Sequence, residues 1–483
     1  MKCLYISSEA YPLAKTGGLA DVAGSLPPAL RSLKKGKNSA VDIRLVIPAY
    51  PDAIKAAGKL KTVASIPATG AIDKVEVLEG TLPGTDVPLW LIRADSYFKR
   101  SGSPYADSHG NDWPDNAARF CIFSRAVCAL AMDELGLDWR ADIVHANDWQ
   151  TGLVPALLSQ YENRPATLFT IHNLAYQGVF SAETFFNLAL PASLWNMHGL
   201  EYHGNMSFIK GGLAYADVLT TVSPTYAQEI QQPEFGFGMD GLLRHRTKEL
   251  TGILNGIDSE NWDPASDNYL AQTYDSETLP DKQVNKSALQ KQLGLKVETD
   301  TPLLGFIGRL VWQKGIDVLV ETLPELLKLP LQWVILGSGE SKQEAILEKL
   351  ASQYPDKLVV ITGYNEKLAH QIEAGCDMFT MLSRYEPCGL NQLYSLRYGT
   401  VPIVSATGGL ADTVVDASNT RQATGFTFKP ASPEDFIEAV QRALSLYQDK
   451  KRWSALARRG MKKDFSWTNS ARQYLDLYIK VSR

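Results

Sequence analysis

The chain has 483 residues, of which 45% are hydrophobic and 21% are charged, a composition typical of a soluble globular protein with two or three domains. The formal net charge is −5 and no block of lysine and arginine stands out, which argues against nucleic acid as a partner. No stretch approaches the ~18 apolar residues of a membrane-spanning helix, so no membrane association is expected.

The first residues and the cysteines indicate in which cellular compartment the protein is expected. The opening sequence is MKCLYISSEAYP. Its apolar stretch is too short for a signal peptide, and it predicts a first strand. None of the five cysteines forms a CxxC pair, which disfavours a disulfide framework or a structural zinc site. We therefore expect a cytoplasmic protein. The cysteines are Cys3, Cys121, Cys128, Cys376 and Cys388.

Short apolar runs in the first half of the chain predict buried strands. Most are continuous rather than alternating, the pattern of strands covered on both faces. Amphipathic stretches between them, such as 115–135, predict helices. The predicted strands are 2–7, 42–48, 88–94, 142–147, 166–173 and 217–223.

The second half repeats this alternation, with a predicted helix at 341–358. Repeated βα units imply parallel, doubly wound sheets. Two such sets, each longer than about 150 residues, predict two α/β domains of one type. The predicted strands here are 303–309, 331–337, 357–363, 378–382 and 401–406.

A polar stretch at 259–286, rich in Asp, Ser and Asn, marks the boundary between the two sets. It predicts an N-terminal domain of 1–256 and a C-terminal domain of 257–465, with the second core beginning at about Pro302. The closing segment 466–483 has apolar residues at helical spacing and is predicted to be a helix that packs back on the first domain.

The hexapeptide TGGLAD occurs twice, at 16–21 and at 407–412. Each copy is predicted to join a strand to a helix, where glycines let the backbone approach a ligand and the helix N-terminus suits phosphate. The simpler explanation is a good packing turn used twice, and for the second copy we favour it. Lys15 directly precedes the first copy and favours an anion site there.

Nucleotide-binding motifs are largely absent. The segment VILGSGESK has Gly337 and Gly339 but a lysine at 342, so the dinucleotide fingerprint fails and a bare NAD-binding module is disfavoured. No P-loop and no Asp-x-Asp pair occurs. A diphosphate would therefore be held by Arg, Lys and main-chain N–H groups rather than by a metal site.

The strongest predicted anion clamp is GFIGRLVWQKGID, residues 305–317. Gly308 and Arg309 follow a strand, and Lys314 precedes a helix. A guanidinium binds two phosphate oxygens and an ammonium adds a point charge. Either cation could be an ordinary surface charge, but both at one strand end favour an anion site.

Three further residues lie at predicted strand ends or helix starts. Glu386 in YEPCGLNQ could serve only as a helix-dipole partner, or could bind sugar hydroxyls. Asp148 in HANDWQ could be only a helix cap. His172 in TIHNLAYQG could be structural, but it shares a predicted sheet edge with Asp148 and Lys15.

Six motifs, in order along almost the whole chain, closely resemble the bacterial glycogen synthase and plant starch synthase family. They are KTGGLADV, HANDWQTGL, HNLAYQG, LNGID, GRLVWQKG and EPCGLNQLY. The resemblance implies the glycosyltransferase B fold, two Rossmann-like domains facing a deep cleft with the last helix crossing back. It also implies metal-independent, cofactor-independent transfer of glucose from ADP-glucose to the non-reducing end of an α-1,4-glucan, with retention of the α configuration.

The resemblance assigns roles residue by residue. Lys15 would contact the donor phosphate and sugar, Arg309 and Lys314 would neutralise the departing diphosphate, and Glu386 would bind the glucose 3- and 4-hydroxyls. His172 would contact the 6-hydroxyl, and Asp148 would lie beside the reacting sugar and acceptor. Tyr105 and Tyr364 would flank the adenine. The other predicted substrate-binding residues are Gly17, Gly18, Asp21, Asn255, Gly308, Cys388, Gly389, Leu390 and Asn391.

Two positions depart from the wider pattern. Residue 391 is Asn where related bacterial enzymes often carry Thr, and both can bind a diphosphate. Residue 394 is Tyr where the wider class of retaining enzymes often has a second Glu. With only Glu386 and Asp148 as carboxylate candidates, we favour same-face attack in which the departing phosphate accepts the acceptor's proton.

Several alternatives stay open at this point. The donor could be UDP-glucose, or the acceptor a small sugar as in sucrose synthesis. A glucan phosphorylase would need a pyridoxal phosphate lysine, and none can be nominated. A catalytically inactive sugar-binding protein is disfavoured because all the named charged residues are present. The sequence does not specify the oligomeric state.

Overall fold

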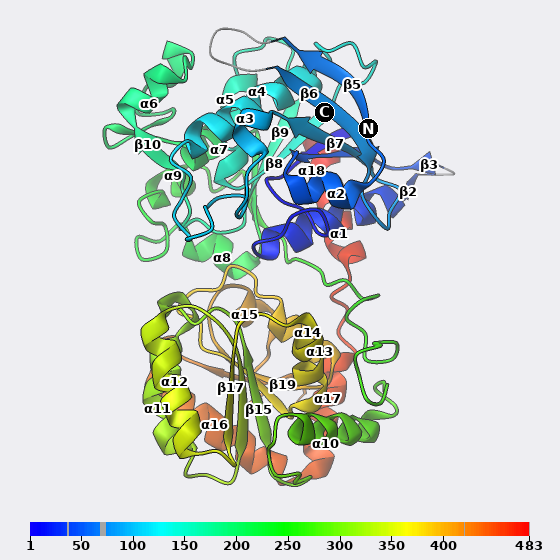
Figure 1. Ribbon diagram of the computed structural model, residues 1–483, viewed down its shortest axis with the longest axis vertical. Helices are drawn as coiled ribbons and strands as arrows, with labels where there is room; N and C mark the ends of the chain where they lie inside the picture. Colours follow the sequence, from blue (N-terminus) through cyan, green and yellow to red (C-terminus); the bar gives the residue numbers. More distant parts are fainter. Residues whose placement is uncertain (36–37, 68–73, 420, 483) are drawn as a thin grey trace. The chain divides into compact units, whose positions relative to one another are not determined.

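The computed structural model describes residues 1–35, 38–67, 74–419 and 421–482, and the chain forms two compact units (Figure 1). Unit 1 comprises Met1–Gly256 and Trp467–Arg483, and unit 2 comprises Ile257–Ser466. Arg483, at the end of the predicted closing helix, lies outside the described residues. Each unit is an α/β domain built on a largely parallel sheet, which confirms the predicted fold class of two Rossmann-like domains.

The sheet of unit 1 has nine strands in the order β14-β13-β9-β8-β1-β4-β7-β6-β5. At its centre, β1 (Lys2–Ile6) pairs in parallel with β4 (Asp42–Pro48) and β8 (Ile143–Asn147). The flanking strands are β5 (Lys61–Ile66), β6 (Val75–Thr81), β7 (Pro88–Arg93), β9 (Ala166–Ile171), β13 (Val218–Thr221) and β14 (Leu250–Gly252).

All six strands predicted in this half are present, but the antiparallel edge formed by β5 and β6 was not predicted. The reason is local: β5 reads KTVASI and is largely exposed, so it lacks the continuous apolar run of a strand covered on both faces. Smaller strands of unit 1 are β2 (Lys34–Lys35), β3 (Asn38–Ser39), β10 (Val179–Ser181), β11 (Glu201–Tyr202) and β12 (Asn205–Ser207).

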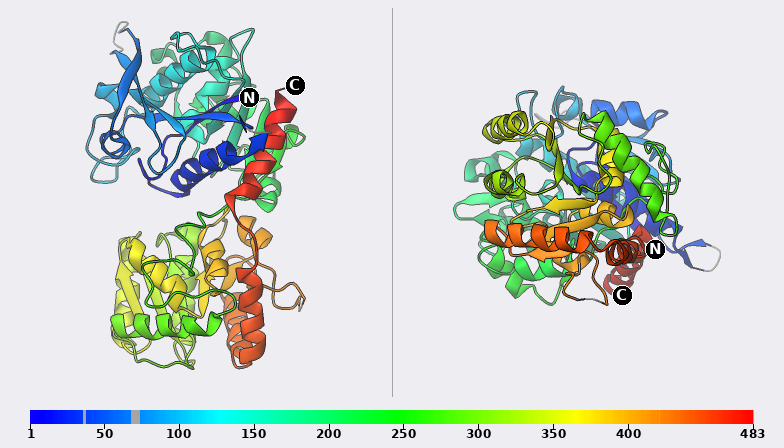
Figure 2. Two further views of the ribbon diagram at one scale, coloured as in Figure 1. Left: turned by 90° about the vertical axis from the view of Figure 1, so that its right-hand side faces the viewer. Right: turned by 90° about the horizontal axis from the view of Figure 1, so that it is seen from below.

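The C-terminal helix α18 (Trp467–Val481) belongs to unit 1, as the sequence predicts, and lies beside α1 (Gly18–Ser32) in Figures 1 and 2. Ser470 Oγ on α18 donates to the carbonyl of Leu254 at 2.6 Å, and Tyr478 OH lies 2.6 Å from His145 Nδ1. Other helices of the unit are α2 (Pro51–Ala57), α3 (Asp95–Phe98), α4 (Asn116–Met132), α5 (Leu153–Leu158), α6 (Ala182–Asn187), α7 (Phe208–Tyr215), α8 (Pro224–Glu229) and α9 (Asp240–His245).

Unit 2 has a six-stranded, fully parallel sheet in the order β17-β16-β15-β18-β19-β20. Counted within the unit, this is the strand order 3-2-1-4-5-6 of dinucleotide-binding folds. The strands are β15 (Leu303–Ile307), β16 (Gln332–Gly337), β17 (Leu358–Thr362), β18 (Met378–Met381), β19 (Val401–Ser405) and β20 (Phe426–Phe428).

Helices cover both faces of this sheet, and Figure 1 shows α11 and α12 on one side with α10 and α13 on the other. Strand β16 explains why: Trp333 and Ile335 enter one buried cluster, while Val334 and Leu336 enter another. The helices are α10 (Lys282–Gln292), α11 (Ile316–Leu326), α12 (Ser341–Gln353), α13 (Glu366–Gly375), α14 (Asn391–Arg397), α15 (Gly408–Thr413), α16 (Pro433–Tyr447) and α17 (Lys450–Met461).

The second core begins earlier than predicted. Tyr274 and Leu279, from the polar stretch 259–286, are buried in the larger cluster of unit 2. Lys282 in the same stretch is buried too, and its ammonium donates to the carbonyls of Glu373 and Ala374 at 2.9 and 2.8 Å. The prediction of Pro302 was wrong because this segment enters the core through hydrogen-bonded polar side chains, which an apolar pattern does not register.

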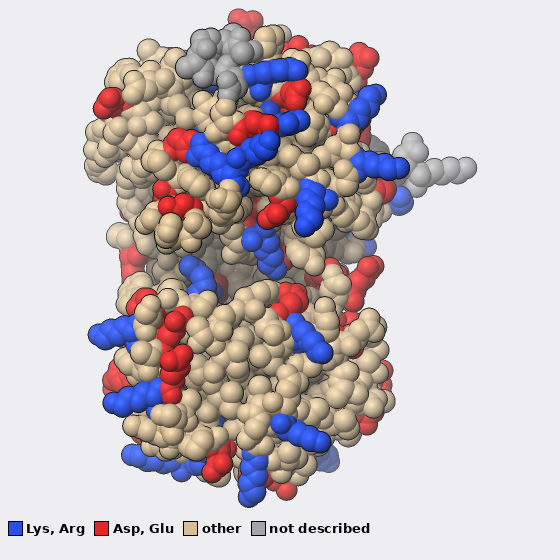
Figure 3. Space-filling view, in the orientation of Figure 1, with Lys and Arg blue, Asp and Glu red and all other residues tan. Residues whose placement is uncertain are grey.

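Charged side chains of both signs are interspersed over the face of the molecule seen in Figure 3. Such mixing gives neither sign a broad field on that face. Within the described ranges of the chain, none of the helices is both long and apolar enough to cross a lipid bilayer.

Candidate functional site

In each unit the predicted site residues follow strands that flank the point where the strand order reverses. In unit 1 this point lies between β1 and β8, and in unit 2 it lies between β15 and β18. Loops at the carboxyl ends of such strands diverge and leave room for a ligand. Lys15, Asp148 and His172 follow β1, β8 and β9, whereas Arg309 and Glu386 follow β15 and β18.

Asp148 holds the main chain of the next loop. It adopts a left-handed conformation with φ 56°, which is uncommon outside glycine. Its side chain does not cap the short helix that follows; instead Oδ1 accepts the main-chain N–H of His172 at 2.7 Å. Burial raises the pKa of Asp148 from 3.8 to about 7. The capping explanation is therefore not what the structure shows.

The His172 imidazole is buried beside the end of β8. Its Nε2 lies 2.8 Å from Oδ1 of Asn147, a residue that the sequence analysis did not select. Burial lowers the pKa of His172 to about 3, so the ring is neutral at physiological pH.

Glu9 is a second site residue that the sequence analysis missed. Its buried carboxylate accepts Thr16 N–H at 2.5 Å and Tyr105 O–H at 3.0 Å. It thereby ties the first TGGLAD copy and predicted Tyr105 to the end of β1. Burial raises the pKa of Glu9. The signal available was an acidic residue directly after the first strand, in SSEAYP.

Lys15 lies on the same loop and forms a 2.8 Å ion pair with Asp21 in the first turn of α1. Its ammonium also lies 5.4 Å from the centre of the Tyr11 ring. Gly17 and Gly18 lie between the two charges, at the start of α1. Two residues predicted for donor binding are thus paired with each other in the ligand-free chain.

Arg309 and Lys314 lie within one short loop of unit 2. Arg309 Nη2 donates to Gln313 Oε1 at 2.8 Å, and Gly308 directly precedes it. Lys314 Nζ forms a 2.5 Å ion pair with Glu386 Oε2. The structure thus brings the predicted diphosphate clamp and the predicted sugar-binding carboxylate together.

The Glu386 loop is fixed from several directions. Ser383 Oγ donates to the Glu386 carboxylate at 2.8 Å, and Gly409 N–H donates to the Glu386 carbonyl at 3.0 Å. Asn391, which begins α14, donates from Nδ2 to the carbonyl of Ile307 at 2.8 Å. This last bond ties the Cys388-Gly389-Leu390 turn to the end of β15.

The two TGGLAD copies play different parts. A Cβ placed at Gly409 would lie 2.1 Å from the Cys388 carbonyl oxygen, and one at Gly408 would lie 1.9 Å from that of Glu386. A Cβ at Gly17 would meet no atom within 4 Å. The second copy is therefore a packing turn that supports the Glu386 loop, whereas the first copy leaves its glycine open.

The remaining predicted residues are Tyr364, Tyr105 and Asn255, of which Tyr105 belongs to the Glu9 cluster. Tyr364 follows β17 and is 71% exposed, with its hydroxyl bonded to Glu366. Tyr105 belongs to unit 1 and directs its hydroxyl to Ser8 and Glu9. Asn255 is buried near the end of unit 1, and its Oδ1 has no hydrogen-bond partner among the described residues.

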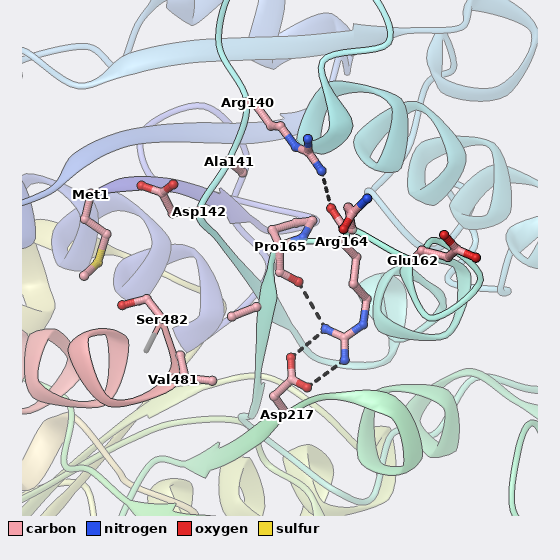
Figure 4. A pocket seen from close by; sticks show the side chains of 12 residues that line it. Met1, Arg140, Ala141, Asp142, Glu162, Arg164, Pro165, Asp217, Val481 and Ser482 are labelled. Atoms are coloured by element: carbon pink, nitrogen blue, oxygen red, sulfur yellow. Dashed lines mark hydrogen bonds and ion pairs between the residues drawn. The ribbon is translucent and has the colours of Figure 1, made fainter.

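A depression of about 790 Å³ lies at the opposite, amino-terminal edge of the unit 1 sheet and contains none of the predicted site residues (Figure 4). Its two arginines are both engaged: Arg164 pairs with Asp217 at 2.7 Å, and Arg140 donates to the Asn163 carbonyl. In the described part of the chain, no group of three or more His, Cys, Asp or Glu residues is arranged to hold a metal ion.

Comparison with known proteins places this geometry in a family. The model of the starch synthase catalytic domain matches residues 2–245, and that of glycosyl transferases group 1 matches residues 290–460. The chain belongs to the family of glycogen and starch synthases. Glycogen synthase 1 of Methylococcus capsulatus is 53% identical over 482 residues, covering 99% of this chain and 96% of the relative.

Other members of the glycogen and starch synthase family are similar to the chain over a comparable length. Glycogen synthase of Thioalkalivibrio sulfidiphilus is 52% identical over 99% of both chains. The catalytic domain of starch synthase IV from Arabidopsis thaliana, solved with ADP and acarbose, has a TM-score of 0.89 and 33% identity over 99% of both chains. Sucrose-phosphate synthase from Thermosynechococcus elongatus, at 18% identity and a TM-score of 0.60, shares the fold alone.

Proposed function

We propose that the chain transfers glucose from ADP-glucose to the non-reducing end of an α-1,4-glucan, with retention of the α configuration and release of ADP. The observation that carries the proposal is the cluster of Arg309, Lys314 and Glu386 at the strand-order reversal of unit 2. The chain's membership in the glycogen and starch synthase family supports the same activity, since it is 52–53% identical to two glycogen synthases over nearly their full length.

The cations act on the leaving group. When the bond between glucose C1 and the phosphate oxygen breaks, negative charge develops on ADP, and the guanidinium of Arg309 with the ammonium of Lys314 stabilises it. Stabilisation of charge that appears only in the transition state is often the largest catalytic contribution. In this assignment Lys314 turns from Glu386 to the diphosphate when the donor binds.

The carboxylate of Glu386 binds the glucose. Once Lys314 engages phosphate, the Glu386 carboxylate can accept sugar hydroxyls, while the bond from Ser383 Oγ to the same Oε2 holds the carboxylate in place. The Cys388-Gly389-Leu390 turn adds main-chain N–H groups, and Asn391 lies beside the end of β15 for the diphosphate. Gly308 allows close approach of the phosphates.

We assign same-face substitution to the reaction. The acceptor 4-hydroxyl attacks C1 from the side on which ADP departs, forming the new C1–O bond as the old one breaks. The departing phosphate oxygen takes the acceptor's proton, so no glucosyl ester forms on the protein. Trapping such an ester on Glu386 or Asp148 would contradict this step.

Unit 1 supplies the remaining contacts. Lys15 and the open turn at Gly17 and Gly18 contact the donor phosphate and sugar, and Asp21 orients Lys15. His172 contacts the glucose 6-hydroxyl. Asp148 holds the main chain of His172 and lies beside the reacting sugar and the acceptor.

The adenine end of the donor and the cellular compartment remain to be assigned. We assign the exposed ring of Tyr364 to adenine, with Tyr105 and Asn255 as further donor contacts. No cofactor or metal has a role in these steps. All five cysteines are buried, free thiols, which suits a reducing cytoplasm.

The test is nucleotide release with a maltooligosaccharide primer in EDTA, comparing ADP-glucose with UDP-glucose. We expect ADP release together with primer lengthening, and α-linked product by proton NMR. Release from UDP-glucose alone would reassign the donor and keep the clamp. Absence of release from either donor would contradict the transferase activity and leave a sugar-binding protein.

A further inference from the structure

We propose that Asn147 is a positioning residue that fixes the His172 imidazole in the Nε2–H tautomer, so that Nδ1 is presented as a hydrogen-bond acceptor. The proposal rests on the proposed function for its catalytic meaning, because His172 is assigned there to a glucose hydroxyl. The tautomer itself follows from the hydrogen bonds around Asn147, at the end of β8.

The orientation of the Asn147 amide is determined by its other partners. Asn147 Nδ2 lies 2.9 Å from the main-chain carbonyl oxygen of Ile6, which can only accept. The flipped amide would place its oxygen against this carbonyl oxygen and against that of His145, which lies 3.5 Å from Nδ2, so acceptors would face acceptors in a buried position. The atom that faces His172 is therefore the amide oxygen, which also accepts the hydroxyl of Tyr5 at 3.2 Å.

The histidine must then donate. Its Nε2 lies 2.8 Å from that amide oxygen, so the hydrogen bond requires a proton on Nε2. Because burial keeps the ring neutral, Nδ1 carries no proton and offers a lone pair. A hydroxyl can donate to that lone pair, whereas the other tautomer would present an N–H group at the same place.

Asn147 and Asp148 together position His172. Asn147 holds the ring of His172 and Asp148 Oδ1 holds its main-chain N–H at 2.7 Å. Titratable groups close to the ring include Asp148, His145 and Tyr5; burial raises the pKa of Asp148 to about 7, lowers that of His145 and raises that of Tyr5. His145 is itself bonded to Tyr478 and Thr170, so it does not compete for His172.

The test reads the tautomer directly. The full chain is labelled with ¹⁵N-histidine, and the ring signals of His172, one of seven histidines, are assigned by their loss in His172→Gln. We expect a protonated Nε2 and an unprotonated Nδ1 in the wild type. Asn147→Ala removes the acceptor oxygen and should mix the tautomers.

Tyr5→Phe is the matched control, because it removes the other donor to the same amide oxygen and leaves the His172 bond. It should keep the Nε2–H signature. A proton on Nδ1 in the wild type would overturn the proposal, and so would an unmixed Nε2–H signal in Asn147→Ala. Should Asn147→Ala fail to fold, the wild-type signal decides, since a proton on Nδ1 there would overturn the proposal.

Steady-state kinetics test whether the tautomer of His172 matters for glucose transfer. With ADP-glucose and primer, we expect Asn147→Ala to lower kcat about tenfold or more with little change in the KM for primer. Equal kcat for Asn147→Ala and wild type would overturn the catalytic role. If the wild type transfers no glucose, the proposed function fails, but the nitrogen signals still decide the tautomer.

Discussion

At the scale of single residues, the candidate site contains two pairs of oppositely charged groups. Lys314 pairs with Glu386, and Lys15 pairs with Asp21. Asp148 is instead buried without a cation, and burial raises its pKa to about 7. These two situations lead to different predictions, one for catalysis and one for the pH dependence of stability.

Replacing Lys314 with alanine should lower kcat about 100- to 1000-fold, because one of the two cations on the leaving group is lost. ADP release with saturating primer measures the effect. Lys349→Ala, at an exposed position of α12, is the matched control and should retain the wild-type rate. A kcat within threefold of wild type in Lys314→Ala would contradict the clamp.

Replacing Asp148 with asparagine should stabilise unit 1 relative to wild type increasingly as pH rises. The folded pKa of about 7 lies above the unfolded value of 3.8, so the wild type loses stability as pH rises through this window. The difference corresponds to roughly 4 kcal/mol between pH 4 and pH 8. Thermal unfolding measured across that range tests it.

Asp52→Asn, at an exposed position on α2, controls for the loss of one negative charge. A constant difference in unfolding free energy between Asp148→Asn and wild type from pH 4 to pH 8 would contradict the prediction.

At the scale of elements, identical hexapeptides do different work because of what packs on them. The second copy of TGGLAD lies against the Glu386 loop, while Gly17 in the first copy is open. The C-terminal helix α18 shows the same dependence on context, since Tyr478 completes a buried chain of hydrogen bonds through His145 to Thr170.

The repeated motif provides its own matched pair of variants. Gly409→Ala should destabilise unit 2 by about 1–3 kcal/mol, because the new Cβ would lie 2.1 Å from the Cys388 carbonyl oxygen. Gly17→Ala has open space and a φ of −159°, so its stability should stay within about 0.5 kcal/mol of wild type. Denaturant unfolding compares them, and equal losses would refute the distinction.

Tyr478→Phe should destabilise unit 1 by about 1–3 kcal/mol, because it leaves the buried His145 Nδ1 without its partner at 2.6 Å. Urea unfolding followed by tryptophan fluorescence measures the loss. Tyr269→Phe removes a hydroxyl from a tyrosine that is 43% exposed and should have little effect. Equal stabilities of the two variants would show that the buried bond contributes nothing.

At the scale of the whole molecule, two sheets of similar design each place charged loops at a reversal of strand order. Under the proposed function, unit 2 carries the cations for the diphosphate and unit 1 carries Lys15, Asp148 and His172. Nucleotide binding should therefore be visible first in the loops of unit 2.

ADP should slow amide hydrogen exchange at 308–314 and 383–391 of unit 2. At 100 times its dissociation constant, it should also stabilise the unit by about 2.7 kcal/mol. Exchange detected by mass spectrometry locates the effect, and Arg309→Ala combined with Lys314→Ala should abolish it. Protection confined to unit 1 would contradict the assignment of the nucleotide.

The sequence was enough to predict the fold class and the core strands of both sheets, because strands covered on two faces appear as continuous apolar runs. It also determined the family, through six ordered motifs. The outlying strands β5, β6, β14 and β20 and the early start of the second core were not predicted, since short outlying strands and hydrogen-bonded polar residues leave no continuous apolar pattern.

The folded structure was needed to show what each polar residue contacts. It paired Lys314 with Glu386 across 72 residues, and it placed Asn147 against His172 and Glu9 against Thr16 and Tyr105. It also separated the two copies of TGGLAD into an open turn and a packed one. These outcomes depend on which strands become neighbours in a sheet, and sequence order does not specify that adjacency.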